Sequence, residues 1–409
     1  MTSLRFHPLL LATLVLSVAC RDTSPHLGAP VLAAESTPTT GTDASTPFLT
    51  ASADGTLWMS WMERSQDSVW TMRVAHRLGE GHWSEPRTVV RDSLLFANWA
   101  DFPSVVVDAK GRLVAHFLRR SAPGKYSYHV WVTSSADQGA TWSAPQRLHR
   151  DTSASEHGFV ALVPQGDGAT LAAWLDGHAT GGESGAMSLA FGVLDASQRV
   201  RRDTMLDTRT CDCCQVAGAR TPDGALFAYR DRSADEVRDI AVVRLAQGRW
   251  HAPAIVHTDG WVTKACPVNG PALAARANDV ALAWFTNARD TAKVQVAFSS
   301  DAGATWSAPF RVDDGAPLGR VDVEWLADSS AFVTWMEHTG KGAAEIRARR
   351  LWRDGRASAA LVVHRGSDAR QAGFPRLATL DGRKVFVTWR DIAAPARLRL
   401  ARIELDGRR

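Results

Sequence analysis

The chain has 409 residues, with 47 basic and 43 acidic side chains and a formal net charge of +4. This small excess, spread along the whole chain, is not the basic footprint of a nucleic-acid-binding protein. No stretch shows sustained helical periodicity, so the pattern favours an all-β protein over a helical one.

The first 19 residues have the pattern of a signal peptide. Arg5 precedes the apolar stretch 8–18, which is too short to span a membrane. The following Leu16-Ser17-Val18-Ala19-Cys20 resembles a bacterial lipobox and predicts lipidation of Cys20. Residues 20–46, rich in Ser, Thr and Pro, are predicted to form a tether. We therefore expect an exported cell-envelope lipoprotein that meets the membrane only through its lipid anchor, with ordinary cleavage and secretion as the alternative.

A two-strand phrase recurs seven times after this segment. Each copy has a short apolar strand, a turn that is often Asp-Gly, and a second apolar strand that often ends in Trp-x-Asp or Trp-x-Glu. The copies span residues 47–63, 102–119, 159–176, 216–231, 271–286, 320–337 and 374–391. Their spacing of roughly 50–58 residues is the length of a propeller blade.

A third alternating strand follows the copies, and a turn and a fourth strand come next, which predicts four-stranded antiparallel blades. The seventh unit has only three strands. Residues 29–35 are therefore predicted to supply its fourth strand and to close the ring. We expect one seven-bladed β-propeller over residues 47–409, with six blades as the alternative. A β-sandwich would not need such regular repeats.

One turn phrase occurs twice between predicted third and fourth strands. It reads Ser135-Ala136-Asp137-Gln138-Gly139-Ala140-Thr141-Trp142 and again Ser299-Ser300-Asp301-Ala302-Gly303-Ala304-Thr305-Trp306. The aspartate can accept backbone N–H groups, the glycine supplies a positive φ, and the tryptophan covers the sheet. The phrase resembles the Asp-box, the hairpin signature of sialidase-like (BNR-repeat) β-propellers. The structural positions are Asp137, Gly139, Trp142, Asp301, Gly303 and Trp306.

The links between blades are predicted to lie on the face opposite the Asp-boxes, and in sialidase-like relatives that face holds the active site. Four cysteines are predicted to gather there. Cys211, Cys213 and Cys214 precede the first strand of blade four, and Cys266 precedes that of blade five. In an exported chain such cysteines predict disulfides. Four converging sulfurs would also suit Cu(I) or Zn, so a soft metal is the alternative, and no other cofactor is expected.

A charged loop follows the second strand of blade four. Seven charges of both signs lie within residues 229–239. A solvated loop laced by its own salt bridges would explain them. The functional alternative is a site with paired carboxylates and ligand-holding arginines. The catalytic candidates are Tyr229, Arg230, Asp231, Arg232, Asp235, Glu236 and Arg238.

Acids and arginines also mark the ends of other second strands and could form a polar ring around the axis. Such a ring could bind a polar ligand, or it could only solvate the mouth of the propeller. The ligand-binding candidates are Glu63, Asp176, Asn269, Glu337, Arg376, Arg390 and Asp391.

The resemblance to sialidases implies a set of site residues. That family uses three arginines, a Tyr–Glu nucleophile pair and an acid Asp, and its first arginine lies in a Phe-Arg-Ile-Pro-like phrase. The corresponding first strand here reads Pro47-Phe48-Leu49-Thr50, without arginine, and the nearest likeness is Phe374-Pro375-Arg376. Tyr229 with Glu236 is the one candidate nucleophile pair.

We therefore expect a propeller that binds or acts on glycans, or another small polar ligand, through its axial face. If it is an enzyme, it is an exo-sialidase-like glycoside hydrolase with an axial pocket holding two carboxyls roughly 5–10 Å apart. A non-catalytic envelope propeller would instead have a shallow or plugged mouth, bonded cysteines and mutually paired loop charges. The third alternative is thiol or metal handling at the cysteines.

Overall fold

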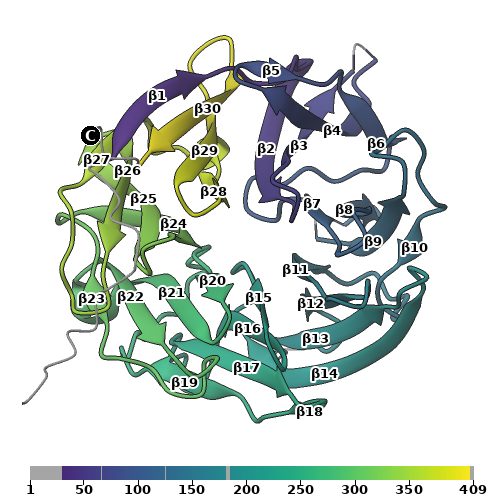
Figure 1. The fold of residues 1–409 in the computed structure, drawn as a ribbon. Coiled ribbons are helices and arrows are strands. Elements are labelled where there is room, and N and C mark those ends of the chain that lie inside the picture. The colour runs from purple at the N-terminus through teal and green to yellow at the C-terminus, as the bar shows by residue number, and fades with distance from the viewer. Residues whose placement is uncertain (1–29, 66, 125, 181–184, 406–409) are drawn as a thin grey trace, which may run out of the picture.

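A computed structural model describes residues 30–65, 67–124, 126–180 and 185–405 (Figure 1). Seven antiparallel sheets form a ring around a central axis, which confirms the predicted seven-bladed propeller. The described chain also has two short 3-10 turns, η1 (Ala288–Asp290) and η2 (Arg370–Ala372). No helix in these ranges is long and apolar enough to cross a bilayer. The predicted signal peptide and Cys20 lie outside the described residues and stay predictions.

The first three blades follow chain order, each with its first strand nearest the axis (Figure 1). Blade one contains β2 (Thr42–Ala51), β3 (Leu57–Arg64), β4 (Trp70–Gly79), β5 (His82–Trp83) and β6 (Arg87–Asp92). Blade two contains β7 (Ser104–Val107), β8 (Leu113–Arg120), β9 (Tyr128–Ser135) and β10 (Gln146–Arg147). Blade three contains β11 (His157–Pro164), β12 (Thr170–Asp176), β13 (Met187–Leu194) and β14 (Val200–Thr210).

The other four blades continue the order and return to the start of the chain. Blade four contains β15 (Ala217–Thr221), β16 (Gly224–Arg230), β17 (Ile240–Ala246), β18 (Arg249–Trp250) and β19 (Ala254–His257). Blade five contains β20 (Ala272–Arg276), β21 (Asp279–Thr286), β22 (Lys293–Ser299) and β23 (Phe310–Arg311). Blade six contains β24 (Pro317–Trp325), β25 (Ala331–Gly340), β26 (Ala343–Leu351) and β27 (Leu361–Ser367). Blade seven contains β28 (Arg376–Leu380), β29 (Lys384–Asp391), β30 (Arg397–Glu404) and β1 (Val31–Glu35).

The strand β1 closes the ring, as the sequence predicts. It pairs antiparallel with β30, so the purple and yellow ends of the chain lie side by side in Figure 1. The carboxylate of Glu35 also accepts hydrogen bonds from Arg77 Nη2 at 3.1 Å and from the Gly81 N–H at 3.0 Å, both in blade one. The last sheet edge is thereby covered. The regular structure begins earlier than the predicted boundary at residue 47, because β2 already starts at Thr42.

The two Asp-boxes form the turns that their residue types predict. In the second copy, Asp301 accepts hydrogen bonds from the Thr305 N–H at 2.9 Å and from the hydroxyls of Ser299 and Thr305 at 2.7 and 2.6 Å. Gly303 has a φ of +79°, and a Cβ at this position would lie 2.7 Å from Leu226 of blade four. The first copy repeats the same bonds around Asp137. Each box therefore also helps to pack its blade against the preceding blade.

The core lies between neighbouring blades. Leu226 and Ala228 of blade four, for example, pack against Leu282 and Trp284 of blade five in a fully buried cluster. Because the blades are antiparallel, the Asp-boxes lie on one face of the ring. The links between blades and the loops after second strands lie on the other face, which we call the link face.

Candidate functional site

The four cysteines form two disulfides on the link face. Cys211 pairs with Cys214, with their Cα atoms 5.9 Å apart, and Cys213 pairs with Cys266, with their Cα atoms 6.2 Å apart. The first bond closes one turn, whereas the second joins the segments that enter blades four and five. This pairing agrees with the predicted disulfides, and a cysteine-bound soft metal stays a prediction.

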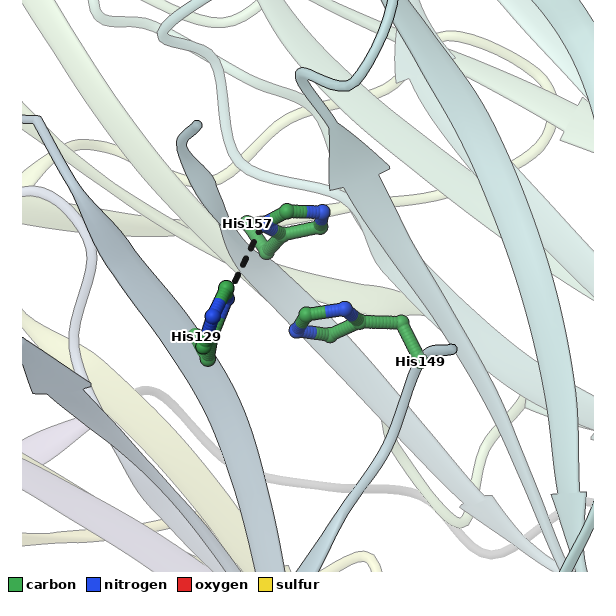
Figure 2. Close-up of side chains that lie close together, drawn as sticks. All are labelled: His129, His149 and His157. Carbon is green, nitrogen blue, oxygen red and sulfur yellow. Dashed lines mark hydrogen bonds between the residues drawn. The ribbon is translucent and has the colours of Figure 1, made fainter. Parts of the chain in front are cut away.

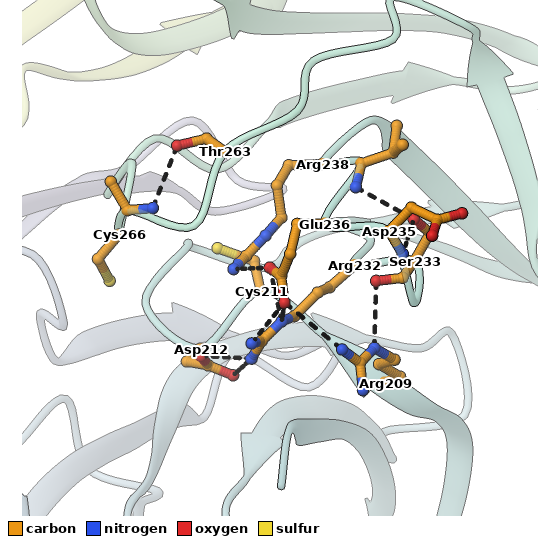
Figure 3. Close-up of polar contacts among 12 residues, drawn as sticks. Arg209, Cys211, Asp212, Arg232, Ser233, Asp235, Glu236, Arg238, Thr263 and Cys266 are labelled. Carbon is orange, nitrogen blue, oxygen red and sulfur yellow. Dashed lines mark hydrogen bonds and ion pairs between the residues drawn. The ribbon is translucent and has the colours of Figure 1, made fainter. Parts of the chain in front are cut away.

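The charged loop between β16 and β17 is internally paired (Figure 3). The Arg232 guanidinium donates to Glu236 and to Asp212, each at 2.9 Å, and Arg238 donates to the second oxygen of Glu236 at 2.8 Å. Arg209 approaches the same carboxylate at 3.5 Å. The hydrogen bond from Arg232 is the main reason that the pKa of Glu236 falls to about 2. The loop charges thus neutralise one another, as expected for a self-paired loop.

Arg230 is buried inside the fold, at 1% exposure. Its guanidinium donates to backbone carbonyl oxygens and lies 4.8 Å from the centre of the Trp261 ring. Burial lowers its pKa to about 9. Its acceptors are the carbonyls of Asn269, Arg238 and Phe285, at 2.6–2.9 Å. These contacts join blades four and five, so the geometry gives Arg230 a structural role.

Tyr229, the candidate nucleophile, is fully buried and donates its hydroxyl hydrogen to Asp207 Oδ2 at 2.5 Å. The carboxylate of Glu236 faces the arginines instead. Burial and the charge of Asp207 raise the pKa of Tyr229 far above its usual range, which opposes formation of a phenolate. Of the other two candidates, Asp235 is exposed, and burial raises the pKa of Asp231.

Three acids of the predicted ring each make the same kind of hydrogen bond to a tryptophan. Each accepts the indole N–H of the tryptophan two residues earlier on the same strand, which explains the Trp-x-acid phrase in blades one, three and six. The bonds are Trp61 to Glu63 at 2.7 Å, Trp174 to Asp176 at 3.1 Å and Trp335 to Glu337 at 2.5 Å. Blade five has Thr286 at the acid position, and Asp259 accepts the Trp284 N–H there at 2.7 Å. A buried indole N–H needs such an acceptor, so these acids complete the core.

The remaining ring candidates lie in three places. The side chain of Asn269 accepts the Arg320 N–H at 2.7 Å and so supports a link. Arg376 lies near the axis with its Nε 3.2 Å from Asp322. Arg390 and Asp391 line cavities on the link face. The structure therefore does not bring the seven candidates together as one ring.

The axial cavity is small. Its volume is about 110 Å³, and it is surrounded by residues of the inner strands and of the links that enter them, including Phe48, Asp101, Gln215, Asp322 and Arg376. Pockets that enclose an organic ligand usually measure about 300–1,000 Å³. The deep axial pocket expected of a hydrolase is thus replaced by a nearly filled channel.

A larger cavity opens on the link face where blades seven, one and two meet. Its volume is about 360 Å³, and we call it the aromatic pocket. Four rings line it together with two amides and one pair of opposite charges. These residues are Trp70, Trp99, Phe102, Phe374, Asn98, Gln371, Asp43 and Arg390. The Arg390 guanidinium donates to Asp43 at 2.7 Å. A neighbouring cavity of about 450 Å³ shares Ala372 and Arg390 with it, so the hollow continues outward along blade seven.

The aromatic wall of this pocket is held in place by its neighbours. Trp99 stacks on Phe374, with ring centres 5.9 Å apart and planes 19° apart. The Arg320 guanidinium lies 5.1 Å from the centre of the Trp99 ring and donates to the carbonyls of Ala369 and Gly373, each at 3.1 Å. The link that carries Phe374 is therefore fixed to the same arginine as Trp99.

A buried acidic trio at the seam of blades two and three is absent from the sequence-based candidates. The Tyr128 hydroxyl lies 3.0 Å from Asp101 Oδ2 and also bonds to Glu156. Asp101 accepts the Phe159 N–H at 2.7 Å. Burial raises the pKa of Asp101 to about 8 and that of Glu156 to about 7. One phenol hydrogen cannot serve two carboxylates at once, so at neutral pH one of these carboxyls keeps its proton.

One sequence signal could have found most of these residues. Trp99, Asp101 and Glu156 each lie just before the first strand of a blade, which is the same kind of position that the cysteines occupy before blades four and five. Their distance in sequence hides the fact that the links converge. Trp70 has no such signal, because it begins a third strand and has the pattern of an ordinary core residue.

Comparisons with known proteins agree with this architecture. Residues 55–238 match the family model described as a BNR repeat-like domain. Together with the two Asp-boxes, this match confirms the resemblance to the sialidase-like BNR propellers. No curated protein matches the chain.

Three solved structures share the fold at low sequence identity. The BP39L lectin from Burkholderia pseudomallei has a TM-score of 0.59 and 13% identity, covering 89% of this chain and 97% of the lectin. A PL25 ulvan lyase bound to a GlcA–Rha3S oligosaccharide has a TM-score of 0.56 and 9% identity, covering 92% and 97%. The Penicillium chrysogenum α-L-arabinanase complexed with arabinobiose has a TM-score of 0.50 and 12% identity, covering 92% and 99%. These neighbours bind or process glycans.

Proposed function

We propose that this BNR-repeat β-propeller of the sialidase-like superfamily binds glycans, and that the aromatic pocket holds the sugar. The observation that carries the proposal is the lining of the pocket, in which Trp70 and Trp99 lie beside the side-chain amides of Asn98 and Gln371. A sugar ring has an apolar C–H face that packs on an aromatic ring, and its hydroxyls need donors and acceptors at the edge.

The size and extent of the pocket support an oligosaccharide. The volume of about 360 Å³ falls in the range of enclosing ligand sites, whereas the axial cavity of about 110 Å³ falls below it. The adjoining cavity of about 450 Å³ offers the ring of Trp389 and the carboxylate of Asp391 to further sugar units. The glycan ligands of the structural neighbours favour the same ligand class.

Binding is favoured over hydrolysis by the state of the candidate catalytic residues. The loop charges of blade four are mutually paired, and the cysteines are bonded to one another. Tyr229 is held neutral in the core. These are the features expected of a non-catalytic propeller with a filled axis.

Glycan-array screening followed by calorimetry with the best oligosaccharide tests the proposal. Trp70→Ala and Gln371→Ala should each weaken binding roughly tenfold or more, because each removes a direct contact of the size that fixes affinity. Trp352→Ala is the matched control, since this half-buried tryptophan lies on the opposite face in the turn after β26.

Mass spectrometry of the incubated oligosaccharide completes the design. Unchanged ligand is expected. Release of shorter sugars would replace the binding proposal with hydrolysis. Failure of every glycan to bind, or equal binding by both pocket variants and the wild type, would overturn the assignment of the aromatic pocket.

A further inference from the structure

Three histidines from two blades converge away from the aromatic pocket. His129 lies on β9 of blade two, His157 begins β11 of blade three, and His149 lies on the link between them (Figure 2). Their exposures are 7%, 0% and 3%, so the cluster is closed to solvent. One ring nitrogen from each lies within 4.8 Å of the others. The three imidazoles between blades two and three are thus close enough together to bind one ion.

Carboxylates fix the orientation of His157. Its Nε2 lies 3.1 Å from Asp151 Oδ2 and 3.5 Å from Asp176 Oδ1. Asp151 Oδ2 also accepts hydrogen bonds from the hydroxyls of Ser153 and Ser155, at 2.5 and 3.1 Å. A carboxylate on this side favours the tautomer that has its proton on Nε2 and its lone pair on Nδ1. Histidine ligands of metals are oriented by carboxylates in the same way.

His157 Nδ1 and His129 Nδ1 are joined by a hydrogen bond and lie 3.4 Å apart (Figure 2). Two nitrogens that bind one tetrahedral zinc at about 2.0–2.1 Å are themselves about 3.3–3.4 Å apart. The separation found here therefore matches one edge of a zinc tetrahedron.

His149 provides the independent sign of a missing partner. Neither of its ring nitrogens has a hydrogen-bond partner among the described residues, although both are buried. A neutral imidazole has one nitrogen lone pair that it can donate to a metal. Leaving such groups unpaired in the interior is costly, and a metal ion would satisfy them.

We propose that His129, His149 and His157 bind one divalent transition metal of the zinc type and that this ion links blade two to blade three. The His149 ring now stacks on His157, with parallel planes and centres 3.7 Å apart. Because a lone pair lies in the plane of its ring, His149 must tilt out of this stack to reach the shared ion. Three imidazoles leave the fourth position of a zinc tetrahedron to another ligand, and the burial of the cluster favours a structural ion over a catalytic one.

The test is metal titration of the full-length protein after removal of metals by a chelator. Elemental analysis should find one equivalent of Zn²⁺, and Co²⁺ should give the visible spectrum of a tetrahedral nitrogen site without thiolate charge-transfer bands. His129→Gln and His149→Gln should each weaken binding roughly 100-fold. Thermal unfolding without metal shows whether each variant folds, and zinc should raise the melting temperature of the wild type but not of these two histidine variants.

Two further variants separate a specific site from surface binding. Asp151→Asn keeps all three imidazoles and should weaken binding roughly tenfold by removing the orienting charge. His82→Gln alters an exposed histidine in blade one and should bind metal like the wild type. The proposal is overturned if the wild type binds no metal at micromolar concentrations, if both histidine variants bind normally, or if the cobalt spectrum shows sulfur ligands.

Discussion

At the residue scale, the carboxyl of Asp101 shows how burial in the fold determines whether a side chain is protonated. Its oxygens contact the Tyr128 hydroxyl and the Phe159 N–H, and Glu156 brings a second carboxyl to the same phenol. Burial is the largest cause of its raised pKa, and the charge of Glu156 adds to it. The folded protein therefore holds a proton here that the unfolded chain would release.

The raised pKa of Asp101 predicts how the free energy of unfolding depends on pH. The pKa of Asp101 is about 8 in the fold, against about 4 in an unfolded chain. Its stabilising contribution is complete below pH 4 and is lost as the pH rises to 8, at roughly 1.4 kcal/mol per pH unit. In urea unfolding, the advantage of the wild type over Asp101→Asn should therefore shrink from pH 5 to pH 8. A constant difference across this range would contradict the prediction.

The acids at the ends of the second strands have a structural role that their sequence position does not reveal. Glu63 and Glu337 have the sequence position of ligand-binding residues, yet each accepts an indole N–H from its own strand. Strand alternation places residues two apart on the same side of a sheet, which allows this contact. The phrase Trp-x-acid is therefore a local core motif in blades one, three and six. In blade seven the same phrase ends in Asp391, which lines a cavity of the link face together with Arg390.

At the element scale, the Asp-box is a self-contained turn. The Asp301 carboxylate accepts three hydrogen bonds from residues within four positions, and Gly303 permits the close approach of Leu226. Such local bonds form in any chain with these residues, which is why the motif predicts its structure. Its place on the face opposite the links separates it from the aromatic pocket.

Asp301→Ala should lower the free energy of unfolding by roughly 1–3 kcal/mol through the lost turn hydrogen bonds. Urea unfolding measures this change in the free energy of unfolding. The control is Asp354→Ala, which alters an exposed turn of the same face. Glycan affinity should stay unchanged in both variants. A folded Asp301→Ala protein that has normal stability but no glycan binding would show that the Asp-box face is functional.

At the scale of the whole molecule, ring closure and one disulfide join segments that are distant in sequence. The bond between Cys213 and Cys266 spans 53 residues and ties blade four to blade five. The strand β1 joins the two ends of the described chain. A ring whose blades contact only their neighbours gains from each such closure, because an open seam would expose two sheet faces.

Replacing Cys213 and Cys266 together by serine should cost about 4 kcal/mol of unfolding free energy, from the entropy of a loop of this length. Replacing Cys211 and Cys214, which lie three positions apart, should cost less. Urea unfolding of both pairs tests this. Thiol labelling of the wild type without reductant should find none of the four as free thiols. Four free thiols would contradict the disulfides and favour the soft-metal alternative.

The seven blades, the closing strand and the Asp-box turns could all be predicted from the sequence alone. Their signals are local, since strand alternation, turn residues and a fixed repeat length act within a few tens of residues. The cysteine group could also be placed on the link face, because it precedes a first strand.

Which residues share a site could be learned only from the three-dimensional arrangement of the blades. The aromatic pocket combines residues near positions 43, 99, 371 and 390, and the histidine cluster combines three positions from two blades. Ring closure brings the first set together, and the packing of blade two on blade three brings the second. No local pattern encodes either contact, because the same side chains would serve equally well in a core or on a solvated surface.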